Sequence, residues 1–327
     1  MGLSLITGAS GHIGYALLKK LTDSGEKVRI FIRKDIPIFD EFDCERAYGD
    51  VTDLQSIAEA CDGVDTVYHL AGIIDINPGL EELTRKVNVD GTKNVVTACI
   101  ENGVKRLVYA SSVDAIPPRP CGRVMTEIDH FTPINLEGTY AKTKAIATQY
   151  VLDKCRVGLI DAVVVQPGAC IGPYDFKVSN VGEMVRMVMA GKFPVSLGFG
   201  AYNFVDVRDV ADGMYAAAQK GKCGSCYILC GQRVTVDEFI SMTSQACGRR
   251  TPKLKIPRVP VMLAAPLAEK YYSATGKTPL FTRYSIRKIN SNCNFSIEKA
   301  QRELGYQPMP ESESLKDMVE WIRENEE

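Results

Sequence analysis

Three residues have the types and spacing needed to move a proton. Tyr140 and Lys144 lie four residues apart, and Ser112 precedes Tyr140 by 28 residues. On a helix, positions i and i+4 share one face, so the Lys144 ammonium can lie near the Tyr140 phenol. A nearby positive charge favours the phenolate and lowers the phenol pKa from its usual value of ~10. The spacing predicts that Tyr140 acts as an acid or base near neutral pH, with Ser112 hydrogen-bonding the substrate oxygen. The alternative is an ordinary amphipathic helix.

A glycine-rich turn follows the first apolar run of the chain. The run Leu3 to Thr7 leads into Gly8-Ala9-Ser10-Gly11-His12-Ile13-Gly14, and a helix-like segment then extends from Tyr15 to about Ser24. The glycines permit a tight turn and close backbone approach, while the helix N-terminus attracts an anion. The spacing is G-x-x-G-x-x-G and differs from the G-x-G-x-x-G fingerprint. Its position after the first strand favours nucleotide binding over a simple turn.

The rest of the first half alternates apolar and amphipathic segments. Strand-like runs span Lys27 to Ile32, Thr66 to Leu70, Arg106 to Ala110 and Ala162 to Gln166, and helix-like runs span Asp53 to Ala60, Leu83 to Glu101 and Thr139 to Lys154. This pattern predicts an α/β fold with a Rossmann-type doubly wound parallel sheet. The alternation becomes irregular after about residue 172. We therefore expect a Rossmann domain over residues 1–172, to which segments near 203–230 return, and a smaller C-terminal substrate lobe over 173–327.

The end of the second strand bears on the choice between NAD and NADP. After the strand the chain reads Arg33-Lys34-Asp35. An acidic residue at this place holds the ribose hydroxyls of NAD, whereas arginine accommodates a 2′-phosphate. Arg33 and Lys34 therefore predict a preference for NADP, because a guanidinium pairs with a phosphate that a carboxylate would repel. Asp35 leaves NAD open, and a solvated basic loop is the other interpretation.

Together these motifs resemble those of extended short-chain dehydrogenases/reductases, the superfamily of the NAD-dependent epimerases and dehydratases. The resemblance covers essentially the whole chain. Besides the residues above, it rests on Asp50-Val51, His69-Leu70-Ala71-Gly72, Asn88, Pro167-Gly168, Gly172-Pro173, the segment Asn203 to Ala211 and the segment Lys299 to Pro308. Within the superfamily, the chain is most similar to dihydroflavonol-4-reductases and 3β-hydroxysteroid dehydrogenases.

The resemblance implies roles for the matching residues. Asn88 would join the catalytic group by supporting Lys144 through a water molecule, and Asp50 would meet the adenine amino group. The other residues implied to contact the cofactor lie in the glycine loop and at strand ends: Gly8, Ser10, Gly11, His12, Ile13, Gly14, Val51, Leu70, Ala71, Gly72 and Pro167, with Tyr140 and Lys144. Members also often form homodimers through a four-helix bundle, which here would use Leu83 to Asn102 and Thr139 to Lys154.

The implied chemistry is hydride transfer that interconverts a ketone and a secondary alcohol, with Tyr140 giving or taking the oxygen-bound proton. Three departures separate the chain from the sugar-nucleotide enzymes of this superfamily. Ser112-Val113-Asp114 stands where dehydratases have Thr-Asp-Glu, the run Asp114 to Pro118 stands where epimerases have Tyr-Gly, and Gln166 stands where many have arginine. We therefore expect a hydrophobic or cyclic substrate that is steroid- or flavanone-like. An epimerase that recycles NAD internally and an inactive NADP-sensing or scaffold protein are the alternatives.

The composition agrees with a soluble enzyme, and we expect a cytoplasmic location. The net charge of −1 gives no sign of a nucleic-acid partner. No apolar run reaches the ~18 residues of a membrane span, although Val259 to Leu267 could line an apolar pocket, touch a membrane surface or form a core helix. The 11 cysteines favour a reducing compartment. Cys223-Gly224-Ser225-Cys226 lacks nearby ligands for a zinc site, so we expect no metal.

Overall fold

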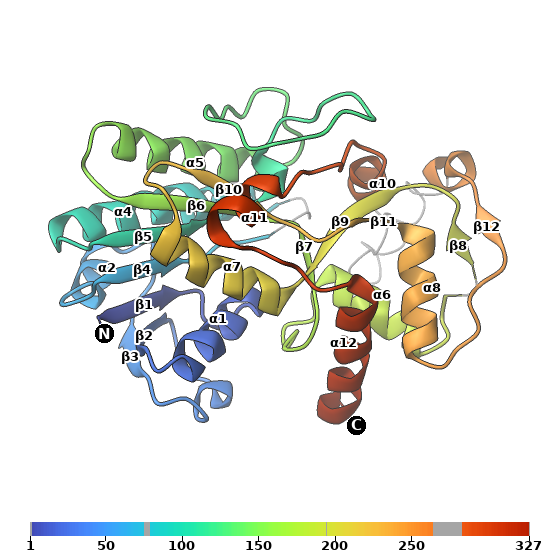
Figure 1. Ribbon diagram of the computed structural model, residues 1–327, viewed down its shortest axis with the longest axis horizontal. Coiled ribbons are helices and arrows are strands. Elements are labelled where there is room, and N and C mark those ends of the chain that lie inside the picture. Colours follow the sequence, from blue (N-terminus) through green and yellow to red (C-terminus); the bar gives the residue numbers. More distant parts are fainter. Residues whose placement is uncertain (1, 75–78, 194, 264–282, 327) are drawn as a thin grey trace.

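The computed structural model describes residues 2–74, 79–193, 195–263 and 283–326. A domain built on a parallel sheet occupies one side of the molecule, and a smaller lobe lies beyond the carboxyl ends of its strands (Figure 1). Both parts contribute residues to the candidate site.

Within the described residues, seven strands form the main sheet in the order β10-β6-β5-β4-β1-β2-β3. All of the neighbouring pairs are parallel. The strands are β1 (Leu3–Thr7), β2 (Lys27–Ile32), β3 (Glu45–Tyr48), β4 (Thr66–His69), β5 (Arg106–Ala110), β6 (Ala162–Pro167) and β10 (Cys226–Leu229). The predicted α/β fold with a doubly wound parallel sheet is confirmed.

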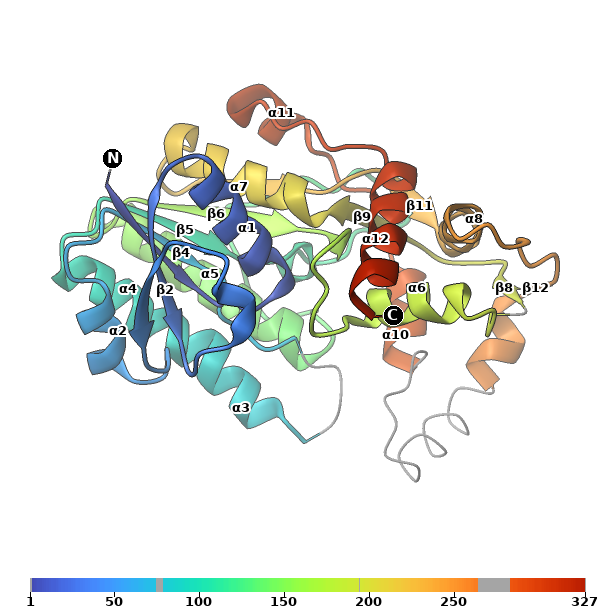
Figure 2. The ribbon, with the colours of Figure 1, turned by 90° about the horizontal axis from the view of Figure 1, so that it is seen from below.

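Helices cover both faces of this sheet (Figure 2). Alternating strand side chains supply two cores, one containing Leu5 and Leu107 and the other containing Ile6 and Val108. The first core packs under α2 (Leu54–Ala60), α4 (Thr92–Glu101) and α5 (Thr139–Arg156), and the second under α1 (His12–Asp23), α7 (Val207–Lys220) and α11 (Glu298–Leu304). Burial on both faces explains why these strands read as continuous apolar runs.

The single helix predicted over Leu83 to Glu101 is wrong in its middle. The structure has α3 (Glu81–Arg85), then a π-helical segment η2 (Lys86–Gly91), and then α4. A Cβ on Gly91 would lie 2.8 Å from the Val51 side chain, so the small residue permits close packing at the end of the wide turn. π-Helical turns are rare and often occur at functional sites. This one carries Asn88.

The smaller lobe follows β6. Its strands are β7 (Ala169–Ile171), β9 (Ala201–Asp206) and β11 (Arg233–Thr235) in one sheet, and β8 (Ser196–Leu197) and β12 (Lys255–Ile256) in another. Its helices are α6 (Asn180–Met189), α8 (Val236–Ala246), α10 (Arg283–Ile289) and α12 (Glu311–Glu326). The chain returns to the main sheet twice, first through α7 and β10 and then through α11. The two parts are therefore interleaved along the sequence.

Part of the apolar run Val259 to Leu267 is described. Val259 and Leu263 have exposed fractions of 68% and 74%. Residues 264–267 lie outside the described residues. None of the helices within the described ranges has the length and apolar character that crossing a membrane requires.

Candidate active site

The glycine loop lies between the end of β1 and the start of α1. Gly8 has a φ of +80°, which glycine adopts readily. A Cβ on Gly14 would lie 2.1 Å from the Gly8 carbonyl oxygen, so the first turn of α1 presses against the loop backbone. Gly11 is the N-cap of α1, and no side chain caps this helix, so its first N–H groups remain available to an anion. These residues fit the pyrophosphate of a dinucleotide.

Ser112 and Tyr140 meet beside the carboxyl end of β5. Ser112 begins the short helix η3 (Val113–Ala115), and its Oγ accepts a hydrogen bond from Asp114 N at 3.1 Å. Tyr140 lies in the first turn of α5, and its phenol is hydrogen-bonded to the Ser112 hydroxyl. A substrate oxygen placed at this pair would contact both hydroxyl groups.

Lys144 lies one turn further along α5 and is only 4% exposed. Its Nζ donates to the Ala110 carbonyl oxygen at 2.7 Å and lies 5.0 Å from the centre of the Tyr109 ring. Burial lowers the pKa of Lys144 to about 8. The structure thus brings Lys144 to the same strand end as Ser112 and Tyr140.

The prediction that Tyr140 has a lowered pKa is wrong for this arrangement. Burial is the largest influence on the phenol and raises its pKa above the ordinary value, and the charge of Asp114 acts in the same direction. The hydrogen bond from Ser112 opposes them and is outweighed. The Lys144 ammonium is directed to a carbonyl oxygen instead. Tyr140 is therefore protonated at neutral pH and able to donate its proton.

Asn88 is buried in the π-helical turn and positions the chain after β4. Its Oδ1 accepts from Ile73 N at 2.8 Å, and its Nδ2 donates to Ile73 O at 3.0 Å and to Thr143 Oγ1 at 3.1 Å. A Cβ on Gly72 would lie 3.1 Å from Asn88 Oδ1 and 3.5 Å from Lys144 Nζ. Asn88 therefore holds the Gly72–Ile73 backbone against α5, next to Lys144.

A hydrogen-bond chain through His69 connects β1 and β4 to the π-helical turn. Ala71 N donates to Thr7 Oγ1 at 3.2 Å, and Thr7 Oγ1 lies 2.7 Å from His69 Nδ1. His69 Nε2 lies 3.0 Å from Thr92 Oγ1, which donates to Asn88 O at 2.7 Å. Each threonine hydroxyl has one proton, so the arrangement is satisfied by a neutral imidazole that accepts at Nδ1 and donates at Nε2.

The buried His69 in this hydrogen-bond network predicts that the folded protein loses stability in acid. Burial lowers the pKa of His69 to about 3, whereas an unfolded histidine has a pKa of about 6.5. Below about pH 6.5 the unfolded chain binds a proton that the folded chain does not, so stability falls as pH drops towards 3. Between pH 7 and 4, His69 should account for a loss of about 3 kcal/mol in unfolding free energy. Urea denaturation at both pH values measures it.

The matched control removes the exposed imidazole of His130. His130→Gln should lose as much stability as the wild type between pH 7 and 4, whereas His69→Gln should lose distinctly less. Equal losses in the wild type and His69→Gln would contradict the prediction.

Arg33 and Lys34 are exposed in the loop after β2. The Asp35 carboxylate, which left NAD open, accepts from Arg46 Nη1 at 2.5 Å and lies 3.4 Å from the Tyr48 hydroxyl. Among the residues that the structure describes, no carboxylate pairs with Arg33 or Lys34. Asp35 is thus engaged with β3, while Arg33 and Lys34 are exposed.

Asp50 and Val51 follow β3. Asp50 Oδ1 accepts from the backbone and the hydroxyl of Thr52, at 2.9 and 2.8 Å. Val51 is buried against Gly91. Asp50 therefore presents a half-buried carboxylate at the strand end, and Val51 packs the turn beneath it.

The remaining predicted cofactor residues lie around the same strand ends. Leu70 N donates to Thr7 O at 3.1 Å and continues the β1–β4 pairing beyond β4. Ile13 and Leu70 pack against the core under α1, Ala71 packs against the opposite core, and Pro167 is the buried last residue of β6. The structure therefore gathers predicted site residues from the carboxyl ends of β1 to β6 along one edge of the sheet.

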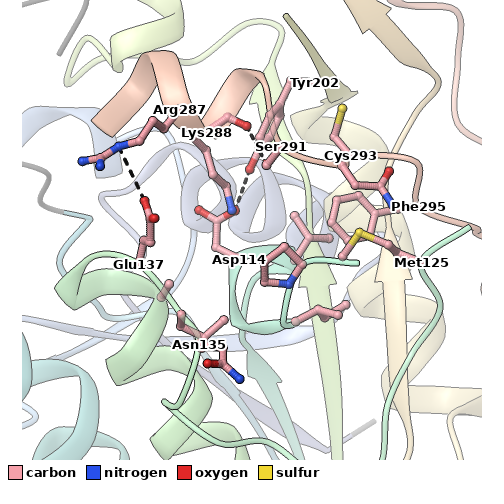
Figure 3. Close-up of a pocket in the computed structure, with 16 residues that line it drawn as sticks. Asp114, Met125, Asn135, Glu137, Tyr202, Arg287, Lys288, Ser291, Cys293 and Phe295 are labelled. Carbon is pink, nitrogen blue, oxygen red and sulfur yellow. Dashed lines mark hydrogen bonds and ion pairs between the residues drawn. The ribbon is translucent and has the colours of Figure 1, made fainter. Parts of the chain in front are cut away.

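A cavity of about 170 Å³ is lined in part by Val113, Asp114 and Ala141, which follow Ser112 and Tyr140 in the chain (Figure 3). Ser112 and Tyr140 themselves are not among its lining residues. Its apolar wall includes Met125 and Phe295, and charged residues stand opposite them. The described lining residues are Val113, Asp114, Ile116, Pro118, Met125, Asn135, Leu136, Glu137, Ala141, Tyr202, Arg287, Lys288, Ser291, Asn292, Cys293 and Phe295. The predicted substrate lobe, residues 173–327, contributes Tyr202, Arg287 and Lys288 to this lining.

Asp114 is a site residue that the sequence reasoning missed. Its Oδ1 accepts from the Tyr202 hydroxyl at 2.6 Å and from Lys288 Nζ at 2.7 Å. The only sequence signal was its position two residues after Ser112. Its partners come from β9 and α10, so no local pattern pointed to them. Asp114 connects the lobe to the Ser112–Tyr140 pair, because its charge acts on Tyr140.

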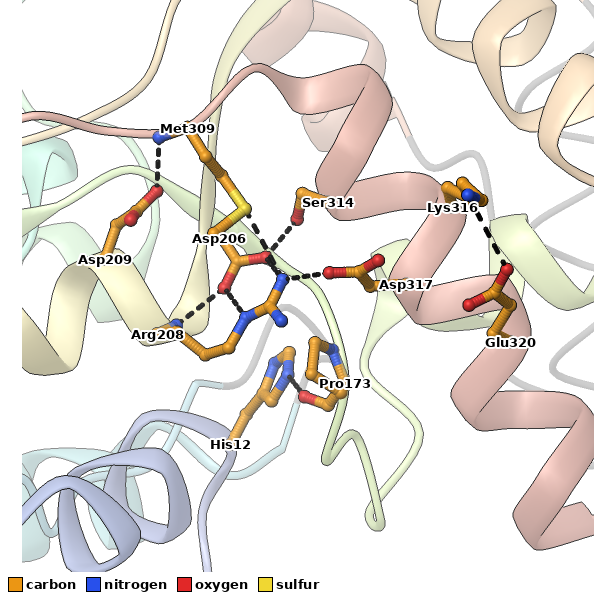
Figure 4. Close-up of polar contacts among 10 residues, drawn as sticks. All are labelled: His12, Pro173, Asp206, Arg208, Asp209, Met309, Ser314, Lys316, Asp317 and Glu320. Carbon is orange, nitrogen blue, oxygen red and sulfur yellow. Dashed lines mark hydrogen bonds and ion pairs between the residues drawn. The ribbon is translucent and has the colours of Figure 1, made fainter. Parts of the chain in front are cut away.

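A second cluster joins the lobe to the sheet (Figure 4). Arg208 Nε and Nη2 each donate to Asp206 at 2.8 Å, and Nη2 also donates to Asp317 of α12 at 2.7 Å. Ser314 Oγ donates to the same Asp206 carboxylate at 2.5 Å. The segment Asn203 to Ala211, recognised from its motif, therefore serves here as a joint between β9, α7 and α12.

Comparison with known proteins extends this description. A model of the NAD dependent epimerase/dehydratase family matches residues 4–230. Sterol demethylase protein B from Methylococcus capsulatus is 35% identical over 98% of both chains. A 3-beta-hydroxysteroid dehydrogenase from Mycolicibacterium neoaurum is 28% identical over 94% of this chain and 88% of its own. A dTDP-glucose 4,6-dehydratase from Streptomyces venezuelae, solved with NAD, has the same fold, with 20% identity, a TM-score of 0.78 and coverage of 99% and 98% of the two chains.

Proposed function

Because the chain belongs to the NAD-dependent epimerase/dehydratase family, we propose that it is an NADP-preferring oxidoreductase that interconverts a ketone and a secondary alcohol on a hydrophobic, ring-containing molecule. The convergence of Ser112, Tyr140 and Lys144 beside the glycine loop carries this proposal. The relatives named for sterols and hydroxysteroids support a steroid-like substrate. The apolar wall of the adjoining cavity is suited to a ring system.

The chain's own residues handle the proton. The nicotinamide, when bound, supplies the hydride chemistry. Tyr140, protonated at neutral pH, donates to the oxygen of the reacting carbon, and Ser112 hydrogen-bonds the same oxygen. The buried Lys144, with its pKa near 8, lies beside Gly72 at the edge of the cofactor site. Asn88 fixes that edge through Ile73.

The proposed preference for NADP is based on the residues that directly follow β2. Arg33 and Lys34 have no acidic partner among the described residues, whereas Asp35 is held by Arg46. A 2′-phosphate can pair with both free cations, and a guanidinium suits it best. NAD remains the alternative cofactor, as in the bound dehydratase structure.

Cofactor titration tests this proposal. The wild type should bind NADPH at least about tenfold more tightly than NADH, and Arg33→Asp should abolish the difference by replacing attraction with repulsion. Quenching of protein fluorescence or nicotinamide emission measures both dissociation constants. Arg250→Asp, at an exposed arginine far along the chain, is the matched control and should keep the preference. Equal binding of both cofactors by the wild type would overturn the NADP assignment.

The second candidate is an epimerase that recycles NAD internally. The charged wall of the cavity, with Asp114, Glu137, Arg287 and Lys288, is the observation that favours it, because a polar substrate would need such groups. Tightly bound NAD that survives purification would support this candidate, whereas NADPH consumption with a cyclic ketone would support the oxidoreductase. A cytoplasmic location and a homodimer through residues 83–102 and 139–154 stay predictions.

A further inference from the structure

The loop between β7 and α6 reaches across to the glycine loop. Lys177 Nζ donates to Ser10 Oγ at 2.8 Å. At the start of the loop, Pro173 O lies 2.7 Å from His12 Nε2 (Figure 4). Burial lowers the pKa of His12, so a neutral ring makes this contact near pH 7. Two polar contacts therefore join a segment of the smaller lobe to the cradle expected to hold the cofactor.

Aromatic packing and backbone shape fix the same loop. The rings of Tyr174 and Phe176 lie 5.0 and 4.9 Å from the Tyr15 ring of α1, measured between centres. Tyr174 has a φ of +73° and Val178 a φ of +43°, which side chains with a Cβ rarely adopt. Such conformations persist where surrounding contacts impose them, often at ligand clamps. The position of Lys177, between these two residues, is therefore set by the fold.

Two further cations act on Lys177. After burial, the charges of Arg33 and then Lys34 are the causes that lower the pKa of Lys177, which places the three cations in one field. In the described parts of the chain, no carboxylate forms an ion pair with any of them. Three cations beside a serine hydroxyl, with no acid to neutralise them, attract a multiply charged anion.

We propose that Lys177 binds the 2′-phosphate of NADP together with Arg33 and Lys34, and that it determines cofactor preference from the opposite lobe. This inference rests on the proposed function, because the phosphate belongs to the proposed cofactor. Arg33 and Lys34 come from the sheet domain, whereas Lys177 follows β7. A cofactor with a 2′-phosphate therefore also secures the contact between the β7–α6 loop and the glycine loop, and NADH lacks the group to do so.

The test compares Lys177→Ala, Lys177→Arg and Lys192→Ala. Lys192 is an exposed lysine in the same lobe, just after α6, and serves as the matched control. Dissociation constants are measured for NADPH, NADH, adenosine 2′,5′-bisphosphate and ADP by calorimetry, without any substrate. Lys177→Ala should weaken NADPH and the 2′,5′-bisphosphate about tenfold and change NADH and ADP less than about twofold, since a charge-assisted hydrogen bond is lost only with the 2′-phosphate. Lys177→Arg should restore most of the binding, and Lys192→Ala should match the wild type.

The outcomes separate this inference from the proposed function. If the wild type prefers NADPH and Lys177→Ala keeps the full preference, the role of Lys177 is overturned and the proposed function stands. If Lys177→Ala weakens NADPH and NADH equally, Lys177 supports the glycine loop only, and the inference fails. If the wild type shows no preference for NADPH, both the proposed NADP preference and the proposed role of Lys177 are contradicted.

Discussion

Replacing Tyr140 by phenylalanine should lower kcat by about 10²- to 10⁴-fold, the usual contribution of a positioned acid or base. The change removes only the hydroxyl that meets Ser112, so the ring still fills its half-buried place on α5. Cofactor binding should stay close to that of the wild type, because the glycine loop and Lys144 are intact. Steady-state kinetics with a cyclic ketone and NADPH, paired with cofactor titration, measures both quantities.

The matched control is Tyr150→Phe. Tyr150 lies on the same helix, is half-buried and contacts Lys93 and Lys154 through its ring face. Removing the Tyr150 hydroxyl in Tyr150→Phe should therefore change kcat very little. Full activity in Tyr140→Phe would refute Tyr140 as the proton donor, whatever substrate is used.

Replacing Arg208 by leucine should lower the free energy of unfolding by about 3 kcal/mol, which is a large part of the 5–15 kcal/mol typical of a folded protein. Asp206 is 1% exposed and receives two hydrogen bonds from the Arg208 guanidinium (Figure 4). Without Arg208, the hydrogen bonds left to this buried carboxylate within the described part of the chain come from Ser314 and the backbone N–H of residue 208. The loss should exceed the value of an exposed ion pair, because the carboxylate cannot regain water.

Urea denaturation of Arg208→Leu at pH 7 measures this loss. Lys316→Ala on α12 provides the control, since Lys316 and Glu320 form an exposed pair 4.0 Å apart. Exposed pairs of this kind contribute little, so the control should stay close to the wild type. Equal stability of Arg208→Leu and the control would show that the joint between α7 and α12 does not depend on this cluster.

Local patterns were enough to predict most of the sheet domain. Apolar runs marked β1, β2 and β5 with the limits found in the structure, because strands buried on both faces leave a continuous signal. The glycine loop was recognisable because the turn from β1 into α1 leaves no room for a Cβ at Gly14. The pair Tyr140 and Lys144 was visible because four residues make about one helical turn.

The π-helical turn containing Asn88 is a feature that the periodicity of apolar residues did not predict. A π-helical turn contains a single residue more than the corresponding α-helical turn. This insertion changes the spacing of the apolar residues too little to be predicted from the sequence. The turn is stabilised by packing of Gly91 on Val51 and by the bonds from Asn88 to Ile73. These partners lie outside the helix, so the sequence of the helix alone could not reveal the turn.

The sequence by itself determined the fold class, the glycine-rich turn after β1 and the candidates for proton transfer. Only the tertiary structure decided the proton affinity of Tyr140 and the surroundings of Ser10. Burial and Asp114 raise the pKa of Tyr140, and Lys177 reaches Ser10 across 167 positions of the chain. Spacing along a helix or turn reports geometry over a few residues. Desolvation and charge at a site depend on every group that folding brings near it, whatever its distance in sequence.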